Sequence, residues 1–299
     1  MTEAFQVEKK WVRQSFDRAA KTYDAASALQ REICDRMLAR LEYIKYRPET
    51  ILDVGSGTGY GTRALSKYYP DSSVLALDLA PGMLQTARGQ TSWWKRNLPM
   101  LHKNRESYIC GDVDSLPLKT SSINMAWSNV TLQWCNDLNI TFAELHRVMA
   151  PEGLFMFSTF GPDTLRELRQ AFSGLDGHTH VNRFTDMHDI GDMLVHAGFS
   201  APVMDMECIT LTYRDLMSLL RELKGMGAHN VTQGRRHGMM GKSEWQVLQS
   251  NYEQFRREGR LPATFEVVYG HAWVSRKQTK MEDGSQIIQM PVQRKKGLV

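Results

Sequence analysis

Short apolar runs alternate with segments of helical periodicity through the middle of the chain, from about residue 45 to residue 160. The apolar runs predict β-strands at 51–55, 73–79, 107–111, 123–129 and 153–160. Apolar residues at helical spacing predict helices at about 60–69, 81–90 and 137–149. Several of the strand runs are continuously apolar, which is typical of strands covered on both faces. This alternation predicts a parallel sheet with helices on each side.

The regions on either side of this alternation have a different pattern. Residues 5–45 carry apolar positions at helical spacing, with a break expected at the stretch YDAAS. After residue 160 we expect helices near 163–173 and 187–197 and strands at 204–213 and 264–276. The polar, glycine-dotted helical stretch between these two strands interrupts the sheet, so we expect it to lie outside as a cap. The predicted domains are a helical segment at 1–46, a sheet domain at 47–276 with the cap inserted at about 214–261, and a disordered tail at 277–299.

Composition narrows the class of protein. The 299 residues are 42% hydrophobic and 23% charged, as in ordinary globular proteins. No run of 18 apolar residues predicts a membrane span, and the N-terminal stretch lacks the apolar centre of a signal peptide. The four cysteines show no C-x-x-C spacing, which argues against a disulfide framework or a zinc site, so we expect a cytoplasmic protein. The net charge of +4 is too small to indicate a nucleic-acid partner, although basic residues cluster at 93–97, 234–238 and 292–299.

A glycine-rich loop follows the first predicted strand. In ILDVGSGTGYG, Gly55, Gly57 and Gly59 recur at every second position. Glycine is costly in ordered backbone and is kept where the chain turns with positive φ or where a ligand approaches closely. A dinucleotide site needs the spacing G-x-G-x-x-G, which this loop lacks. The spacing G-x-G-x-G favours a smaller adenosyl ligand that has no pyrophosphate.

Three further strand ends carry polar residues that suit such a ligand. Asp78 ends the second strand, where a carboxylate can accept both hydroxyls of a ribose. Asp112 follows the third strand and can accept from an exocyclic amine, and Val113 beside it can cover the base. Asn129 ends the fourth strand. Since parallel strands end at one edge of the sheet, these residues predict a site for a nucleoside with an amino-acid arm.

The motifs DVGSGTG, ALDLAPGML, GDVDSLP and WSNVTLQW, taken in this order, resemble those of class I S-adenosylmethionine-dependent methyltransferases. The resemblance covers about residues 45–160. It implies a Rossmann-like α/β fold, with a mostly parallel seven-stranded sheet whose last strand is antiparallel. It also implies S-adenosylmethionine as cofactor and S-adenosylhomocysteine as product. The implied cofactor-binding residues are Gly55, Gly57 and Gly59 toward the methionine part, Asp78 at the ribose, Leu79, Asp112 and Val113 around the adenine, Asn129 at the rim, and Asp53 before the glycine loop.

A narrower resemblance runs through most of residues 12–275. The stretches FDRAAKTYDAAS, LQREI, SNVTLQWCNDL, VNRF and RELKGMGAHN resemble the malonyl-acyl-carrier-protein O-methyltransferases of biotin synthesis. The segment 88–107 is longer than the corresponding linker of that family. The implied reaction esterifies the free carboxyl of a malonyl thioester. A carboxylic acid with a pKa of about 4 is already ionised at neutral pH, so no general base and no metal are expected.

The resemblance also suggests substrate contacts. Arg183 is the leading candidate to bind the carboxylate, because the planar guanidinium matches it best, and Tyr23 is expected to close the site. Trp134 and Phe184 are candidates for the wall of the acyl pocket. The carrier protein of that family presents an acidic helix, which basic side chains would attract. The candidate carrier contacts are Arg221, Lys224, Arg235 and Arg236.

Several alternatives stay open at this point. The acceptor could be another small carboxylate or a phenol or quinone precursor, or the chain could bind S-adenosylmethionine without catalysis. Malonyl-coenzyme A presents the same pantetheine arm as malonyl-acyl carrier protein, so the sequence does not separate these two partners. A nucleic-acid methyltransferase is disfavoured, because the stretch after the fourth strand lacks the proline-containing motif expected there. The oligomeric state is open.

Overall fold

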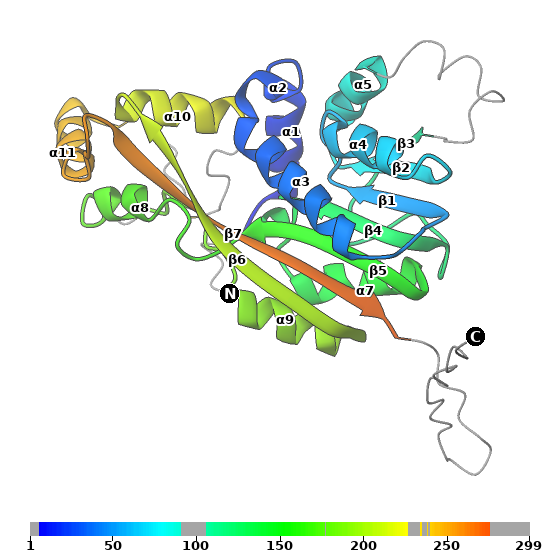
Figure 1. Ribbon diagram of the computed structural model, residues 1–299. Helices are drawn as coiled ribbons and strands as arrows, with labels where there is room; N and C mark the ends of the chain where they lie inside the picture. Colours follow the sequence, from blue (N-terminus) through cyan, green and yellow to red (C-terminus); the bar gives the residue numbers. More distant parts are fainter. Residues whose placement is uncertain are drawn as a thin grey trace, which may run out of the picture.

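The computed structural model describes residues 6–90, 106–176, 178–226, 234, 238 and 240–275. Its centre is one seven-stranded sheet with the strand order β3-β2-β1-β4-β5-β7-β6 (Figure 1). Strand β7 is antiparallel to both of its neighbours, and the remaining pairs are parallel. The predicted sheet, including its antiparallel last strand, is therefore confirmed. The strands are β1 Thr50–Val54, β2 Ser73–Asp78, β3 Glu106–Cys110, β4 Ile123–Asn129, β5 Met149–Phe160, β6 Phe199–Tyr213 and β7 Leu261–Val274.

Helices cover both faces of this sheet (Figure 1). Successive residues of β5 point to opposite faces, so Leu154 and Met156 join one buried cluster while Phe155 and Phe157 join another. The first cluster includes residues of α3, α4, α8, α10 and α11, and the second includes residues of α7 and α9. The described helices are α1 Lys9–Ala19, α2 Tyr23–Ala26, α3 Ala28–Arg40, α4 Tyr60–Tyr68, α5 Pro81–Gln90, α7 Leu138–Val148, α8 Arg166–Phe172, α9 Met187–His196, α10 Leu216–Gly225 and α11 Lys242–Glu253, with short 3₁₀ turns η2 Leu41–Tyr43 and η4 Leu132–Trp134.

The predicted N-terminal helical region forms three helices, because the chain breaks on both sides of Tyr23–Ala26. The helical region is interrupted as predicted, but the breaks fall at residues 20–22 and at Ser27, and most of the stretch YDAAS forms the short helix α2. Helix α3 buries Ile33 and Met37 completely, and α1 packs against α5 at the edge of the sheet. Strand β6 begins five residues earlier than expected, at Phe199 rather than at 204. Its exposed positions alternate with half-buried ones, which weakens the apolar signal at its start.

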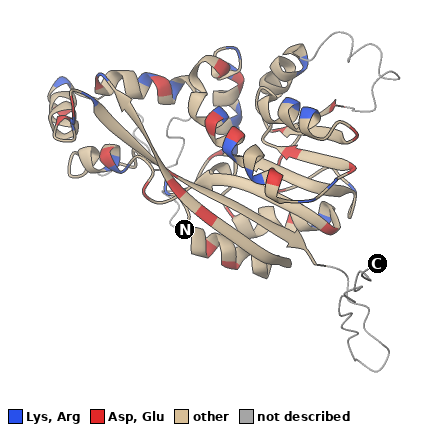
Figure 2. Cartoon of the chain, viewed as in Figure 1, with Lys and Arg blue, Asp and Glu red and all other residues tan. Residues whose placement is uncertain are grey.

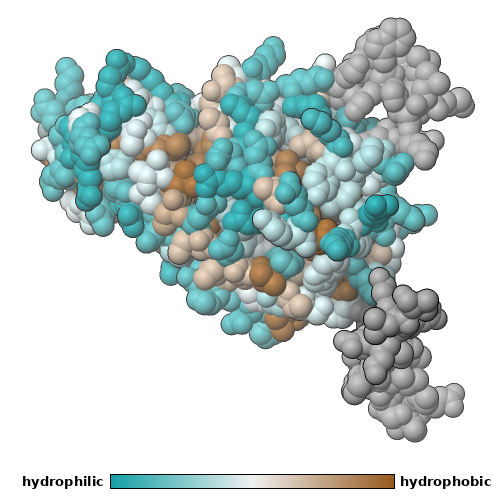
Figure 3. Space-filling model, in the orientation of Figure 1, coloured by the Kyte–Doolittle hydropathy of each residue, from teal (hydrophilic) through white to brown (hydrophobic). Residues whose placement is uncertain are grey.

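Strands β6 and β7 form a long ribbon that continues past the end of β5. Their pairing runs from Phe199–Val274 to Tyr213–Leu261, whereas β5 pairs with β7 only as far as Val267. The helices α10 and α11 connect β6 to β7 and lie outside the sheet, and α8 packs against α11 and β7 (Figure 1). Figure 3 shows a largely hydrophilic face whose apolar atoms gather in small patches, including one beside α10. The division into domains stays a prediction.

Several sequence features fall outside the described residues: the 93–97 basic cluster, Arg235, Arg236 and the 277–299 tail. Over the described surface, Lys and Arg are interspersed with Asp and Glu on α3 and α10 (Figure 2). Among the described helices, none combines the length and the apolar character needed to cross a membrane.

Candidate functional site

The glycine loop turns at the carboxyl end of β1, as the spacing requires. Gly55, Gly57 and Gly59 have φ angles of +71°, +53° and +80°, a region that side chains with a β-carbon disfavour. The amides of Gly55 and Ser56 donate to the carbonyl of Leu77 on β2, which fixes the loop against the neighbouring strand. Gly59 precedes α4, and a β-carbon there would lie 3.0 Å from Ala87 of α5. The loop therefore presents bare backbone to the space above the sheet.

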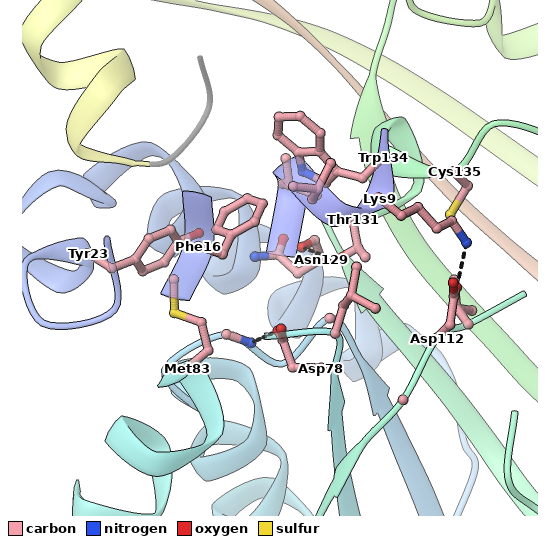
Figure 4. Close-up of a pocket in the computed structure, with 17 residues that line it drawn as sticks. Lys9, Phe16, Tyr23, Asp78, Met83, Asp112, Asn129, Thr131, Trp134 and Cys135 are labelled. Atoms are coloured by element: carbon pink, nitrogen blue, oxygen red, sulfur yellow. Dashed lines mark hydrogen bonds and ion pairs between the residues drawn. The ribbon is translucent and has the colours of Figure 1, made fainter. Parts of the chain in front are cut away.

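A cavity that is open at its mouth lies above these strand ends, and we call it the glycine-loop cavity. Seven of the nine predicted cofactor residues line it: Gly55, Gly57, Asp78, Leu79, Asp112, Val113 and Asn129. Tyr23 and Trp134 line it too, and with Phe16 they stand on one side while Lys9 and Asp112 close the other (Figure 4). The structure thus brings together residues from four strands that are far apart in the sequence.

Asp78 is the main acceptor in the glycine-loop cavity. Its Oδ2 accepts from the amide of Gly57 at 2.8 Å, and its Oδ1 accepts from the amide of Ala80 at 2.8 Å. Each oxygen keeps further acceptor capacity for hydroxyl donors. Burial raises the pKa of Asp78 to about 6, although its hydrogen bonds from Ala80 and Gly57 oppose the rise. This carboxylate is ionised at neutral pH and fixed in orientation.

The other two predicted cofactor residues lie behind the loop. Gly59 does not line the glycine-loop cavity, and its conformation serves the turn into α4. Asp53 is only 2% exposed and accepts a 2.6 Å hydrogen bond from the hydroxyl of Thr62. Burial, with the nearby charge of Asp78 adding to it, raises the pKa of Asp53 to about 7. Asp53 lines a smaller adjoining cavity together with Tyr60, on the α4 side of the loop.

Two predicted cofactor contacts are already engaged within the protein. The amide nitrogen of Asn129 donates to the carbonyl of Gln30 at 2.9 Å, and its oxygen accepts from Ser158 at 2.9 Å. Asn129 therefore links α3 to β5. The Oδ1 of Asp112 forms a 2.5 Å ion pair with Lys9, which also pairs with Asp114. A ligand amine that binds Asp112 must share this carboxylate with Lys9.

A second, mainly apolar cavity, which we call the apolar cavity, adjoins the first. Phe16, Tyr23, Val130 and Trp134 line both cavities and so form the wall between them. Val130 has a φ of +51°, which is rare for a β-branched residue and marks local strain. The predicted acyl-pocket residue Phe184 lines the apolar cavity, as do Leu29, Phe160, Leu165, Leu223, Met226 and Phe265.

Two amide side chains lie among these apolar residues. The side-chain oxygens of Gln30 and Asn182 are buried and accept no hydrogen bond from any described residue. Burying a polar atom without a hydrogen-bond partner is energetically unfavourable, so such an atom commonly binds a ligand or a water molecule. Nothing in the sequence pattern distinguished these two amides from ordinary helix and loop residues.

The aromatic side chains of the wall between the cavities come from α1, α2 and η4. Phe16 meets Trp134 edge to face at 5.4 Å between ring centroids, and it meets Tyr23 at 6.3 Å. Phe16 was visible in the sequence only as an apolar helical position, because its contact with Trp134 joins segments more than 100 residues apart. Burial, with the charges of Asp78 and Asp24 adding to it, raises the pKa of the Tyr23 phenol above its usual range. Tyr23 is therefore a hydrogen-bond donor at neutral pH and not a base.

Cys135 also lines the glycine-loop cavity, which the sequence did not predict. Burial raises the pKa of its thiol to about 12, so the neutral form dominates at neutral pH. A neutral thiol is a poor nucleophile. Among the described residues, no group of three or more His, Cys, Asp or Glu side chains could hold a metal ion.

The three predicted cationic contacts that the structure describes, Arg183, Arg221 and Lys224, do not line these two cavities. Arg183 is exposed and lines a third space, the outer groove, which borders the apolar cavity at Asn182 and Phe184. Arg221 and Lys224 lie exposed on α10, whose Leu223 reaches the apolar cavity. The structure therefore does not bring Arg183 to the site where a carboxylate would meet the glycine-loop cavity.

Comparison with known proteins identifies the family. Residues 52–157 match the methyltransferase domain family. The malonyl-acyl-carrier-protein O-methyltransferase of Gallionella capsiferriformans is 57% identical over 284 residues, which cover 95% of this chain and 97% of that protein. The chain belongs to the malonyl-acyl-carrier-protein O-methyltransferase family. The Nitrosospira multiformis protein of the same name is also 57% identical, over 89% of both chains.

The fold of this O-methyltransferase family member is shared more widely than its sequence. The crystal structure of the YcgJ protein from Bacillus subtilis aligns with a TM-score of 0.55 at 12% identity, covering 81% of this chain and 98% of that one. This likeness supports the class I methyltransferase fold and says nothing of the substrate. The family assignment that the sequence motifs predicted is confirmed by the high-identity relatives.

Proposed function

We propose that this protein transfers a methyl group from S-adenosylmethionine to the free carboxylate of a malonyl group carried on acyl carrier protein. The observation that carries the proposal is the pair of adjoining cavities. One is lined by the glycine loop and by the charged side chains of Asp78 and Asp112, whereas the described lining of the other holds no charged side chain. They share the wall of Phe16, Tyr23 and Trp134. Relatives with 57% identity carry the name of this activity.

The glycine-loop cavity has the donors and acceptors that S-adenosylmethionine needs. Gly55 and Gly57 line this cavity without side chains and would lie against its amino-acid part. Asp78 would accept from the two ribose hydroxyls. Leu79 and Val113 would cover the faces of the adenine ring, and Asp112 would face its amino group.

The bound cofactor supplies an activated methyl group: a carboxylate oxygen forms the new C–O bond as the C–S bond breaks, and the electron pair of that bond stays on sulfur. The acid is already ionised, so the protein has no proton to remove. The neutral phenol of Tyr23 and the wall residues Phe16 and Trp134 would orient the reacting groups and exclude water. The pKa of Cys135, raised by burial to about 12, keeps its thiol out of the reaction.

The apolar lining itself favours this transfer. One anion and one cation become two neutral products, so charge disappears as the reaction proceeds. A site of low polarity solvates the separate charges poorly and disfavours the reactants more than the transition state. A cation strongly bound beside the carboxylate would stabilise the charged reactant and so slow the transfer. Among the described residues lining the apolar cavity, none is a Lys or Arg.

A methyl-transfer assay with labelled S-adenosylmethionine tests the proposal. Four parallel reactions contain malonyl-acyl carrier protein, malonyl-coenzyme A, acetyl-acyl carrier protein or no acceptor. We expect base-labile label on the malonyl thioesters alone, with the carrier protein preferred. Cofactor binding without transfer to either malonyl thioester would overturn the proposed substrate. A small carboxylate, a phenol or quinone precursor, or binding without catalysis would then have to be considered.

A further inference from the structure

The outer groove beside Arg183 borders the apolar cavity. It runs along the segment between α8 and α9 and is lined by residues of 172–186. Asn182 and Phe184 line both spaces, whereas Arg183 between them lines the groove alone. The ring of Phe184 packs edge to face on Phe160 at 5.8 Å. Three spaces therefore follow one another: the outer groove, the apolar cavity and the glycine-loop cavity.

Arg183 differs from the other arginine that lines the described groove. The guanidinium of Arg169 donates to the carbonyls of Pro162 at 2.8 Å and Thr164 at 3.1 Å, so its donors are used. Arg183 forms no ion pair or hydrogen bond with any residue that the structure describes. Three carboxylates also line the groove: Asp176 pairs with His180 at 2.7 Å, Asp186 caps α9, and Asp189 lies in the first turn of α9. Among the described residues, none occupies the donors of Arg183, which would leave them for an external anion.

This order of features matches the arm that carries the malonyl group. A phosphopantetheine thioester has a phosphate at one end, two amides in its middle, and the thioester with its acyl group at the other end. The unpaired oxygens of Gln30 and Asn182 suit the amide N–H groups of the middle part. The planar guanidinium of Arg183 suits the phosphate.

We propose that the outer groove receives the phosphate end of the phosphopantetheine arm of acyl carrier protein, and that Arg183 binds this phosphate rather than the malonyl carboxylate. The inference rests on the proposed function. It assigns Arg183 to the far end of the substrate, away from the reacting atoms. The malonyl carboxylate then reaches the wall of Phe16, Tyr23 and Trp134 through the apolar cavity.

Acceptors with and without the phosphate test this assignment. Methyl transfer by the full-length protein is measured with malonyl-acyl carrier protein and with malonyl-pantetheine, which lacks the phosphate. We compare wild type, Arg183→Ala and a control, Arg88→Ala, which removes one exposed positive charge from α5. We expect Arg183→Ala to lower kcat/KM for the carrier-bound substrate by about tenfold or more, and to change malonyl-pantetheine by less than about twofold. The control should match wild type with both acceptors.

Two other patterns would overturn the assignment. Equal losses on both acceptors would mean that Arg183 acts on the malonyl end, as the sequence predicted. No loss on either acceptor would mean that the arm does not pass Arg183. Malonyl-coenzyme A, measured in parallel, carries the phosphate but no carrier protein. A loss of kcat/KM with this acceptor too would come from the phosphate, and a loss with the carrier protein alone would come from the protein surface. If the wild-type protein methylates no malonyl thioester, the proposed function itself is wrong. That result is seen with the wild-type protein alone, so it is distinct from the two outcomes for Arg183→Ala. A thermal melt of each variant checks that the fold is intact.

Discussion

Thr131 packs directly against the α-carbon of Gly55. A β-carbon built on Gly55 would come within 2.7 Å of the Cβ of Thr131, a separation that real side chains do not tolerate. Gly55 also has a φ of +71°. Thr131, in the turn after β4, therefore fills the space beside the α-carbon of Gly55 in the glycine loop. The ends of β1 and β4 are packed together through this contact.

The substitution Gly55→Ala should distort this contact and weaken both folding and cofactor binding. The positive φ alone costs about 1–2 kcal/mol for an alanine, and the collision with Thr131 adds to that cost. Urea unfolding and calorimetric titration with S-adenosylmethionine measure the two effects. The matched control is Gly89→Ala in α5, where a β-carbon would meet nothing within 4 Å. A stable Gly55→Ala protein that binds normally would contradict the close contact.

The substitution Asp78→Ala should weaken cofactor binding strongly. Each hydrogen bond to a charged acceptor contributes roughly 1.5–3 kcal/mol, so the loss is at least on the order of tenfold in Kd. The same change frees the amides of Gly57 and Ala80, so the loop loses one of its fixed points. Titration calorimetry gives the affinity. An unchanged Kd would remove Asp78 from the binding site.

Binding of S-adenosylmethionine should weaken as the pH falls from 7 to 5. The pKa of Asp78 lies near 6 because of burial, so the carboxylate becomes protonated over this range and loses acceptor capacity. Above pH 7 this carboxylate is ionised, and its contribution to affinity no longer changes. The variant Asp78→Asn should bind more weakly and show a flatter pH profile. If both proteins showed the same pH dependence, a different group would be responsible.

The stability of the unliganded protein should decrease as the pH rises from about 4 to about 7, through the contribution of Asp53. Burial raises the pKa of Asp53 to about 7 from a reference near 4. Over this interval the folded state binds the proton that the unfolded state has released, so raising the pH favours unfolding. The difference in unfolding free energy between pH 5 and pH 8 should be smaller in Asp53→Asn than in wild type. Urea unfolding at both pH values measures it, and an equal difference would contradict the assignment.

The substitution Tyr23→Phe should lower kcat by about tenfold and leave the affinity for S-adenosylmethionine within about threefold. The expected cost corresponds to one hydrogen bond near the reacting groups. The raised pKa of the Tyr23 phenol implies no loss of activity from its ionisation up to about pH 10. Single-turnover kinetics separate the chemical step from binding. Wild-type kcat in Tyr23→Phe would limit the role of Tyr23 to the shape of the wall.

The parts of the site that could be predicted are those set by residues close together in the sequence. The glycine spacing and the residues at the ends of β1, β2, β3 and β4 follow from strand patterns and from the rule that parallel strands end at one edge. Asp78, Val113 and Gly57 line one cavity for this reason. The fold class followed from the same alternation of strands and helices.

The parts that could not be predicted depend on contacts between distant segments. The pairing of Asn129 with the carbonyl of Gln30 and that of Lys9 with Asp112 join residues about 100 positions apart. No pattern in the sequence around these residues indicates either pairing. Arg183 lies in the loop between α8 and α9. Its two neighbours, Asn182 and Phe184, line the apolar cavity, whereas Arg183 lines only the outer groove. A single sequence contains no signal for that choice.

Helix α1 is fastened at both of its ends across the glycine-loop cavity. The backbone of Val7 exchanges two hydrogen bonds with the side chain of Asn136, and Asp17 accepts from the amide of Gly82 at 2.7 Å. Phe16 of this helix lines both cavities. The two anchors therefore fix the position of Phe16 between the two cavities, so the loss of either anchor would loosen the wall that both cavities share.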